Sequence, residues 1–306
     1  YDEFIEMLTR FKNEIPECTA PYTAPGLKST QALPEFYQGA TADYVKVDGK
    51  WVDGMAQDNM LTALQNLQDA YTAGLIDQEA ITNTTSACRD EWYAGTVGCF
   101  PYWGGLWGET LTVRLKQNVP DAEVIALPPI EGATYLYSAP SVQVISSKLS
   151  DDQVASVYKY FIEYMHDGGE GQVLFQSGVE GVHWQQSGNN IDPLPTISKP
   201  AEAFRKAWIT PWLALTPMTA TDKNVEVSQE VTDSLAVVSA NAKNISVFPV
   251  SEQRTMITSD LTTTRENIIS RVAMGQLTPE EGMAEYKAQA ETLNVAQALE
   301  EMNANA

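Results

Sequence analysis

The chain has 306 residues, 43% of them hydrophobic, so it is long enough for two lobes or one large domain and can bury a substantial core. Asp and Glu total 40 against 19 Lys and Arg, which gives a formal net charge of −21. Nucleic acid and anionic lipid headgroups are bound through basic patches, so this composition argues against both as partners. A neutral small molecule remains compatible with it. No apolar run is long enough to span a membrane.

The three cysteines, Cys18, Cys88 and Cys99, form no CxxC pair, and their odd number argues against a disulfide framework. Cys99 lies in an apolar run and is expected to be a small buried hydrophobic residue. A bridge between Cys88 and Cys99 stays open at this point.

Residues 1–14 are predicted to form a helix, because apolar side chains recur at helical spacing and acidic residues occupy the first turn. Residues 16–34 are rich in Pro, Thr and Gly and are expected to form a loop. The dipeptide Asp-Gly at 48–49 is typical of a two-residue hairpin turn. The flanking stretches, 44–47 and 51–52, are therefore predicted to be paired strands.

A second apolar helix face covers residues 60–71, and Gly74 is placed to end that helix. Residues 111–116 can form a further helix. Three short apolar runs are expected to be buried strands, at residues 97–100, 124–127 and 141–145.

Ser150 and Gln153 have the spacing of a capping box, so a helix is predicted over 151–165. Residues 177–199 are polar and are expected to be a loop. After an apolar helix face that ends at Gly275, the sequence Thr-Pro-Glu-Glu at 278–281 predicts the start of a last long helix. Strands that alternate with helices indicate an α/β fold, and the absence of repeats or linkers suggests lobes that interleave along the chain.

The common catalytic signatures are missing, since no GxSxG, GxGxxG, P-loop or HExxH pattern occurs. The chain has only two histidines, His166 and His183. Glu180 and His183 have a carboxylate-x-x-imidazole spacing that can ligate iron in a helix bundle, but glycines surround them and no second copy exists. We therefore predict no catalytic residue, no metal site and no cofactor. Glycoside hydrolysis needs only two carboxylates, and 40 acidic residues single out no pair.

Residues 95–108 are the most unusual stretch, because a glycine-rich strand runs into a turn that bears Tyr102, Trp103 and Trp107. Ligands of open α/β sheets bind beyond the carboxyl ends of the strands, where such a turn would lie. A pyranose has a face of C–H groups that stacks on an indole ring, while its hydroxyls need polar partners. The alternative is that the two tryptophans only plug the contact between loop and core, since Trp is usually well buried.

Residues 178–184 place Glu180, His183 and Trp184 on a glycine-rich loop, where each could face a polyol. Alternatively, Trp184 packs inward and Glu180 caps a nearby helix. Tyr137, in the stretch 135–140, is a third candidate contact at a crossing between lobes.

These stretches make the chain resemble the family 1 extracellular solute-binding proteins, especially the lipoproteins that serve bacterial ABC transporters. The opening Tyr-Asp-Glu-Phe resembles the start of the family's second lobe, and Gly-Leu-Ile-Asp-Gln-Glu at 74–79 resembles a characteristic turn. The glycine-led strand at 94–98 followed by Trp103 or Trp107, the loop at 178–184 and the helix pair around 274–281 complete the resemblance.

The resemblance implies a two-lobed periplasmic-binding-protein-like α/β fold of type II, with interleaved lobes joined by a hinge. Residues 1–134 and 205–306 would form lobe two, and 135–204 a remnant of lobe one whose amino-terminal part is absent. It also implies extracellular capture of a carbohydrate, without catalysis, for the permease subunits of an ABC importer. The full-length protein would be lipid-anchored. The ligand contacts would be Tyr102, Trp103, Trp107, Tyr137, Glu180, His183 and Trp184.

Two other functions are compatible with the residues: a secreted carbohydrate-active enzyme and a ligand-sensing ectodomain of the same fold. If an amino-terminal part is absent, the strand 141–145 and the helix from Asp151 lack partners. We then expect exposed apolar side chains at Val142, Val144, Val157, Phe161 and Ile162, and a chain that self-associates and binds sugar weakly.

Overall fold

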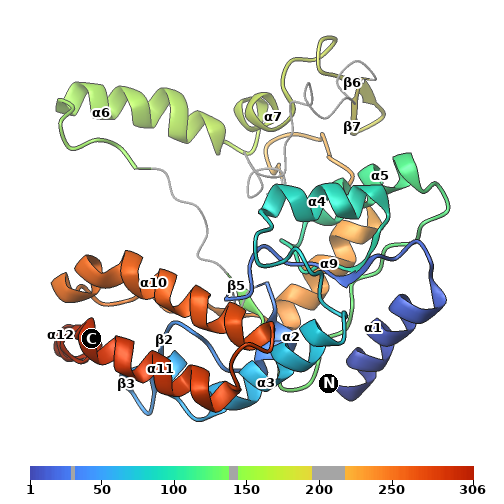
Figure 1. Ribbon diagram of the computed structural model, residues 1–306. Helices are drawn as coiled ribbons and strands as arrows, with labels where there is room; N and C mark the ends of the chain where they lie inside the picture. The colour runs from blue at the N-terminus through green and yellow to red at the C-terminus, as the bar shows by residue number, and fades with distance from the viewer. Residues whose placement is uncertain (29–31, 138–143, 195–217) are drawn as a thin grey trace. The chain divides into compact units, whose positions relative to one another are not determined.

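The computed structural model describes residues 1–28, 32–137, 144–194 and 218–306, and it divides into two compact units (Figure 1). Unit 1 contains Tyr1–Trp103, Leu111–Ser138 and Ala236–Ala306, and unit 2 contains Gly104–Thr110 and Ala139–Leu235. The chain therefore passes between the units several times. Two of these passages lie inside helices, α5 (Leu106–Asn118) and α9 (Gln229–Asn241), and not in loops. The lobe boundaries expected at 134 and 204 remain a prediction.

Unit 1 begins with helix α1 (Asp2–Glu14), as its apolar spacing predicted. Its inner face buries Phe4 and Leu8, and the Phe4 ring meets the rings of Tyr22 and Phe36 edge to face. Within the predicted loop lies strand β1 (Ala20–Tyr22), which pairs in parallel with β4 (Val97–Cys99). A bridge between Tyr22 and Ile76 extends this small sheet. Helix α2 (Pro34–Tyr37) is fully buried against it.

The predicted hairpin is present as β2 (Tyr44–Val47) and β3 (Lys50–Asp53). Asp48 and Gly49 both have positive φ, 47° and 80°, as the favoured two-residue hairpin turn requires. The 3₁₀ turn η1 (Gly54–Ala56) follows.

Helix α3 (Asn59–Thr72) ends at Gly74 as predicted. The Leu75 N–H donates to the Ala70 carbonyl at 2.8 Å and the Gly74 N–H to the Tyr71 carbonyl at 3.0 Å, which is the bond pattern of a Schellman cap. Helix α4 (Thr85–Ala94) is capped by the Thr84 hydroxyl and ends at Gly95, whose φ is 77°.

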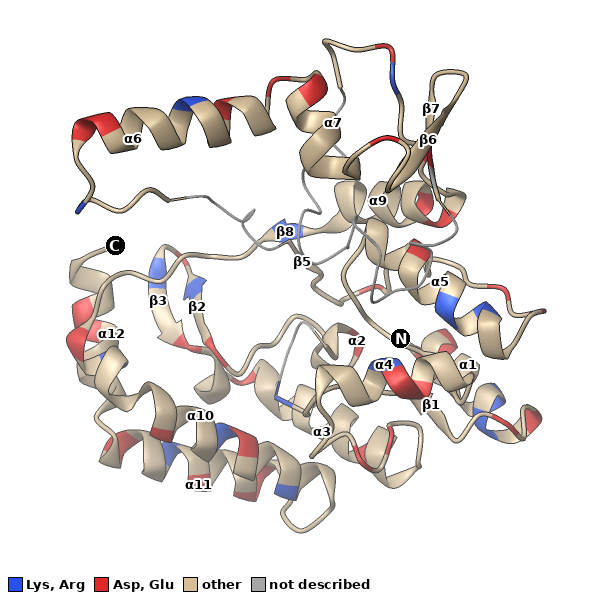
Figure 2. Cartoon of the chain, turned by 90° about the horizontal axis from the view of Figure 1, so that it is seen from above, with Lys and Arg blue, Asp and Glu red and all other residues tan. Residues whose placement is uncertain are grey.

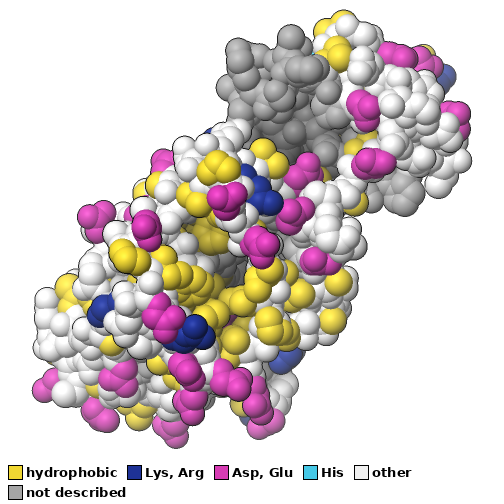
Figure 3. Space-filling model, turned by 90° about the vertical axis from the view of Figure 1, so that its right-hand side faces the viewer, with side chains coloured by type: hydrophobic (Ala, Val, Ile, Leu, Met, Phe, Trp, Pro, Cys, Tyr) yellow, Lys and Arg dark blue, Asp and Glu magenta, His cyan; other side chains and the backbone are white. Residues whose placement is uncertain are grey.

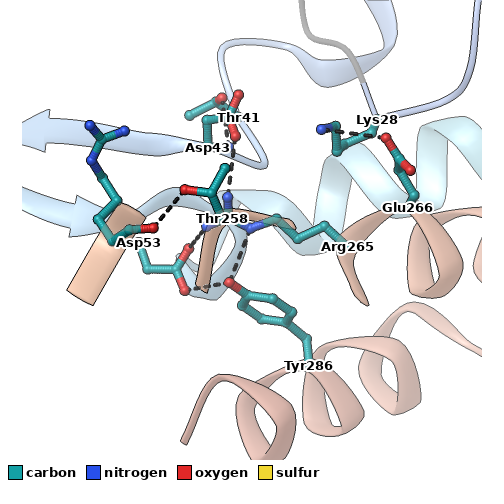
Figure 4. A network of polar contacts seen from close by, with 9 residues as sticks. Lys28, Thr41, Asp43, Asp53, Thr258, Arg265, Glu266 and Tyr286 are labelled. Atoms are coloured by element: carbon teal, nitrogen blue, oxygen red, sulfur yellow. Dashed lines mark hydrogen bonds and ion pairs between the residues drawn. The ribbon is translucent and has the colours of Figure 1, made fainter. Parts of the chain in front are cut away.

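The carboxyl-terminal helices α10 (Glu252–Ala273), α11 (Pro279–Thr292) and α12 (Val295–Ala304) complete the core of unit 1. The capping box predicted at Thr278 and Glu281 is confirmed. A buried ion pair ties these helices to the hairpin: the Arg265 guanidinium contacts Asp53 at 2.7 Å and Asp43 at 3.2 Å (Figure 4). The Tyr286 hydroxyl donates to Asp53 at 2.6 Å. Because the buried cation is paired and hydrogen-bonded, its burial is compensated.

Short β5 (Leu136–Tyr137) pairs in parallel with β8 (Lys243–Asn244), also in unit 1. Unit 2 contains α6 (Asp151–Val157), a π-helical turn (Tyr158–Glu163) and α7 (Glu170–Ser177), followed by the hairpin of β6 (Trp184–Ser187) and β7 (Asn190–Pro193). The capping box at Ser150 is confirmed.

One strand prediction is wrong. Residues 124–127 form no strand, and Ile125 is 74% exposed. Two prolines follow directly at 128 and 129, and none of the strands that the structure describes pairs with this segment. Of the third predicted strand, residues 141–143 lie outside the described residues, whereas Val144 belongs to no strand and is 87% exposed.

Apolar side chains along α6 and the π turn are exposed, including Val157 and Phe161, whereas Ile162 is half-buried; Val142 lies outside the described residues. The cause that we expected for this exposure stays a prediction. Acidic side chains are spread over most elements, with fewer basic ones among them (Figure 2). Within the described residues, no helix has both the length and the apolar character needed to cross a bilayer.

Candidate functional site

Three aromatic rings of unit 1, those of Trp92, Phe100 and Tyr102, pack in sequence on one another, and Trp103 directly follows Tyr102 in the chain. We call these four residues the aromatic row. The Phe100 and Tyr102 rings are stacked, with centroids 4.9 Å apart and planes at 28°. The Trp92 ring lies 6.1 Å from Phe100 and is tilted by 36°. Trp103 is 56% exposed. The first three rings thus lie within 36° of their neighbours' planes, and Trp103 adds an exposed indole next to them in the chain.

The aromatic row lies where the chain leaves the parallel strands of unit 1. Phe100 directly follows β4, and Thr23 directly follows its parallel neighbour β1. Asp77 follows the residue that bridges to Tyr22. Carboxyl ends of parallel strands meet at one edge of a sheet, which is where open α/β proteins bind ligands.

Helix α4 holds the aromatic row. The Arg89 guanidinium donates to the Tyr102 hydroxyl at 3.0 Å and to the Ser86 hydroxyl at 2.9 Å. Trp92 stands three residues further along and therefore on the same helix face. Its indole N–H donates to the Leu111 carbonyl at 3.3 Å. One helix face thus fixes both ends of the ring stack.

Beside the aromatic row, a polar cluster of four residues joins the strand ends to α4. The buried Thr23 hydroxyl oxygen lies 3.0 Å from Asp77 Oδ2 and 2.8 Å from Glu91 Oε2. Asn83 Nδ2 donates to Asp77 Oδ2 at 2.6 Å and to Glu91 Oε1 at 3.3 Å. Burial raises the pKa of Glu91, the nearby Asp77 charge adds to this, and the hydrogen bond from Thr23 opposes it.

This arrangement can bind but carries no catalytic signature. Ring faces can stack on the C–H face of a sugar, and carboxyl and amide groups can bond its hydroxyls. Among the residues that the structure describes, no group of three or more His, Cys, Asp or Glu is arranged to hold a metal ion. All three cysteines are free: Cys88 is fully buried, whereas Cys99, expected to be buried, is half-buried.

The predicted site residues of the first aromatic stretch fall into two groups. Tyr102 and Trp103 belong to the aromatic row. Trp107 lies in unit 2, at the start of α5, and is only 8% exposed, as the packing alternative requires. Tyr137 is exposed on β5 in unit 1.

The loop at 178–184 is organised by its own hydrogen bonds in unit 2. The Trp184 indole N–H donates to the Gly178 carbonyl at 2.9 Å, and the ring packs on Val173 and Ile191 with 3% exposure. His183 Nδ1 accepts a bond from the Val179 N–H at 2.9 Å, whereas Glu180 is exposed. Trp184 therefore follows the inward alternative, and its buried ring offers no face to a ligand within this unit.

Sequence reasoning missed Trp92, Phe100 and Arg89. No helix was predicted over residues 85–94, although Arg89 and Trp92 are three residues apart and Ala-Gly at 94–95 precedes the predicted strand. The residues that they contact across the loop could not be predicted from their spacing in the sequence.

A hollow of about 300 Å³ runs along α1 on the face shown in Figure 3, where apolar side chains gather among acidic ones. It is lined by Glu3, Glu6, Met7, Arg10, Phe11, Glu14 and Ile15. These residues all belong to α1 and its end, and none belongs to the aromatic row.

Solved structures of solute-binding proteins are similar to this chain over nearly its whole length. The alginate-binding protein AlgQ2 has a TM-score of 0.65 at 16% identity and covers 99% of this chain. An HMO-binding, ABC-transporter-associated solute-binding protein from Bifidobacterium longum infantis has 0.63 at 14%, and FusA from S. pneumoniae, in complex with kestose, has 0.60 at 16%. Each match covers 99% of this chain, which spans 66–68% of those structures.

At these identities the likeness establishes the fold, which is the α/β fold of periplasmic solute-binding proteins. No family model matches the sequence, and no curated protein does.

Proposed function

We propose that this protein captures an oligosaccharide outside the cell and delivers it to the permease of an ABC importer, without chemistry. The observation that carries the proposal is the aromatic row at the carboxyl edge of the unit 1 sheet, with hydroxyl, amide and carboxyl groups beside it. Solved relatives of the same fold are named for alginate, HMO and kestose binding, which supports a sugar as the ligand class. Attachment by a lipid anchor belongs to the same proposal.

The ligand would stack on Tyr102 and Trp103, since the Tyr102 ring is partly exposed and backed by Phe100 and Arg89, and the Trp103 ring is largely exposed. Aromatic stacking favours the apolar face of a pyranose or furanose and tolerates different linkages. Tyr137, Glu180 and His183 stay predicted contacts. Trp107 and Trp184 would support the fold of unit 2 instead.

The test is calorimetry of the purified chain against a panel of neutral and acidic oligosaccharides. We expect Trp103→Ala to weaken binding by about 1–3 kcal/mol, the scale of one large aromatic contact. Tyr158→Ala removes a ring of nearly equal exposure in unit 2, 55% against 56% for Trp103, and serves as the matched control. Unchanged affinity in Trp103→Ala and in Tyr102→Ala would rule out the aromatic row as the binding surface.

The same incubations separate capture from catalysis. A binding protein returns the oligosaccharide intact, so chromatography of the mixture should show no shorter products. Product formation would favour the carbohydrate-active enzyme.

A further inference from the structure

In the polar cluster beside the aromatic row, the short contacts between oxygen atoms need more donor hydrogens than ionised side chains supply. A threonine hydroxyl donates one hydrogen bond. The Thr23 oxygen nevertheless lies within bonding distance of two carboxyl groups, 3.0 Å from Asp77 and 2.8 Å from Glu91. If both carboxyl groups were ionised, the single Thr23 hydrogen could bond only one of them. At the other contact, a lone pair of the Thr23 oxygen would face a lone pair of the carboxylate. A proton on one carboxyl group removes the conflict, because that group can then donate to the Thr23 oxygen.

The hydrogen-bond partners place this proton on Glu91. Asp77 accepts from the Glu79 N–H at 2.9 Å and from Asn83 at 2.6 Å, so its charged form is well solvated by donors. Glu91 receives only a long contact of 3.3 Å from Asn83 besides Thr23. Within the described parts of the chain, neither carboxyl group has an ion-pair partner. Burial and the Asp77 charge raise the pKa of Glu91, in the same direction.

The cluster matters for α4 because it bonds the helix to two other segments of unit 1. Cys88 is the one fully buried residue of α4. Thr23 after β1 and Asn83 in the loop before α4 both bond Glu91, and the same helix carries Arg89 and Trp92 of the ring stack. Among the described residues, Tyr71 on α3 and Cys88 on α4 interact electrostatically with the pair. The backbone N–H of Glu79 donates to Asp77, and Arg89 and Asp90 adjoin Glu91 in the sequence.

We propose that Glu91 carries a proton shared with Asp77 through Thr23, and that this protonated carboxyl group is a positioning residue that fixes α4 beneath the aromatic row. When the proton leaves, two carboxylates face each other without a cation, and α4 loses its anchor. The sugar affinity of the aromatic row then falls as pH rises. Only this last step rests on the proposed function.

The proton is tested first without any ligand. A group whose pKa is higher in the folded than in the unfolded protein stabilises the fold at low pH, and this contribution is lost as pH rises through the folded pKa. As pH rises above the usual pKa range of a glutamate, the melting temperature of the wild type should therefore fall more steeply than that of Glu91→Gln, whose amide donates to Thr23 at every pH. Asp90→Asn removes an exposed neighbouring charge and should retain the wild-type slope. Equal slopes in the wild type and Glu91→Gln would overturn the proposal, whatever the ligand.

The positioning role is tested by calorimetry with an oligosaccharide from the panel above. Wild-type affinity should fall by at most about tenfold per pH unit, since one proton is involved. Glu91→Gln should keep the acid-pH affinity at neutral pH. If it binds with the wild-type pH profile, Glu91 does not position the site.

Two further experiments cover the remaining outcomes, a second variant and the addition of calcium. If Glu91→Gln does not fold, Asp77→Asn provides a second test, because it removes the charge that repels an ionised Glu91. The melting temperature of Asp77→Asn should then begin to fall with pH at a lower pH than that of the wild type, if it falls at all. If calcium chloride restores the wild-type melting temperature at neutral pH and leaves Glu91→Gln unchanged, the pair holds a cation, and the shared proton is disproved.

Discussion

Two tryptophan-bearing stretches, 100–103 in unit 1 and 178–184 in unit 2, look alike in sequence and differ in structure. Both combine aromatic residues with nearby glycines: Gly104 directly follows Trp103, and Gly178 and Gly181 precede Trp184. Trp184 is buried at 3% exposure, with its N–H bonded inside its own loop, whereas Trp103 is 56% exposed. The difference lies in the neighbours: Trp184 opens a hairpin that supplies Ile191 and lies against Val173, while two glycines follow Trp103. Burial of an indole ring thus depends on the next element along the chain.

The largest expected effect is the difference in stability loss between removal of the Trp184 ring and removal of the Trp103 ring. Trp184→Ala should destabilise unit 2 by about 3–5 kcal/mol, because it removes a large side chain from a small core. Trp103→Ala should change the free energy of unfolding by no more than about 0.5 kcal/mol, as at other exposed positions. Urea unfolding of both variants measures this contrast. Similar losses would mean that the rings have the same structural role.

A smaller effect is expected at the glycine that accepts the Trp184 bond. Gly178 has φ 84°, and a Cβ atom there would lie 2.7 Å from His183 Nδ1. Gly178→Ala should therefore cost about 1–3 kcal/mol, from backbone strain together with the displaced imidazole. Gly181, with φ 76° and no atom within 4 Å of such a Cβ, is the matched control and should lose less on the same change. Equal losses at both positions would show that the His183 contact does not matter.

The smallest effect should come from His183. Its Nδ1 accepts the Val179 N–H, so His183→Phe should lose about 0.5–1.5 kcal/mol, the net worth of one hydrogen bond. His183→Asn keeps a short acceptor and should recover part of the loss, again by urea unfolding. If His183→Phe instead leaves stability intact and lowers oligosaccharide affinity, His183 belongs to the binding surface, as the resemblance implied.

The fold was predictable from the sequence where a signal acts locally. The Asp-Gly turn at 48–49, the capping boxes at Ser150 and Thr278 and the cap at Gly74 each depend on a few neighbouring residues, and each is confirmed. The strand at 124–127 was predicted wrongly because its apolar run pairs with none of the described strands, and pairing depends on residues distant in the sequence.

The candidate site was predictable only in part, for the same reason. Tyr102 and Trp103 stand out because they lie in a stretch unusually rich in glycine and aromatic residues. The residues that contact this stretch in the folded chain have no such signal. Arg89 reaches Tyr102 across 13 residues, and Thr23 reaches Glu91 across 68. No spacing rule connects such positions, so the aromatic row and the polar cluster emerge only when the chain is folded.

The buried pair around Arg265 has a consequence for biosynthesis. Arg265 follows Asp53 by 212 residues and Asp43 by 222, and the Tyr286 hydroxyl that completes the network comes later still. Chains grow at roughly 5–20 residues per second, so the hairpin waits on the order of 10–40 s for its cation. Until α10 emerges from the ribosome, the hairpin and α3 lack the apolar helices that cover them, so the nascent chain carries that apolar surface uncovered during this interval.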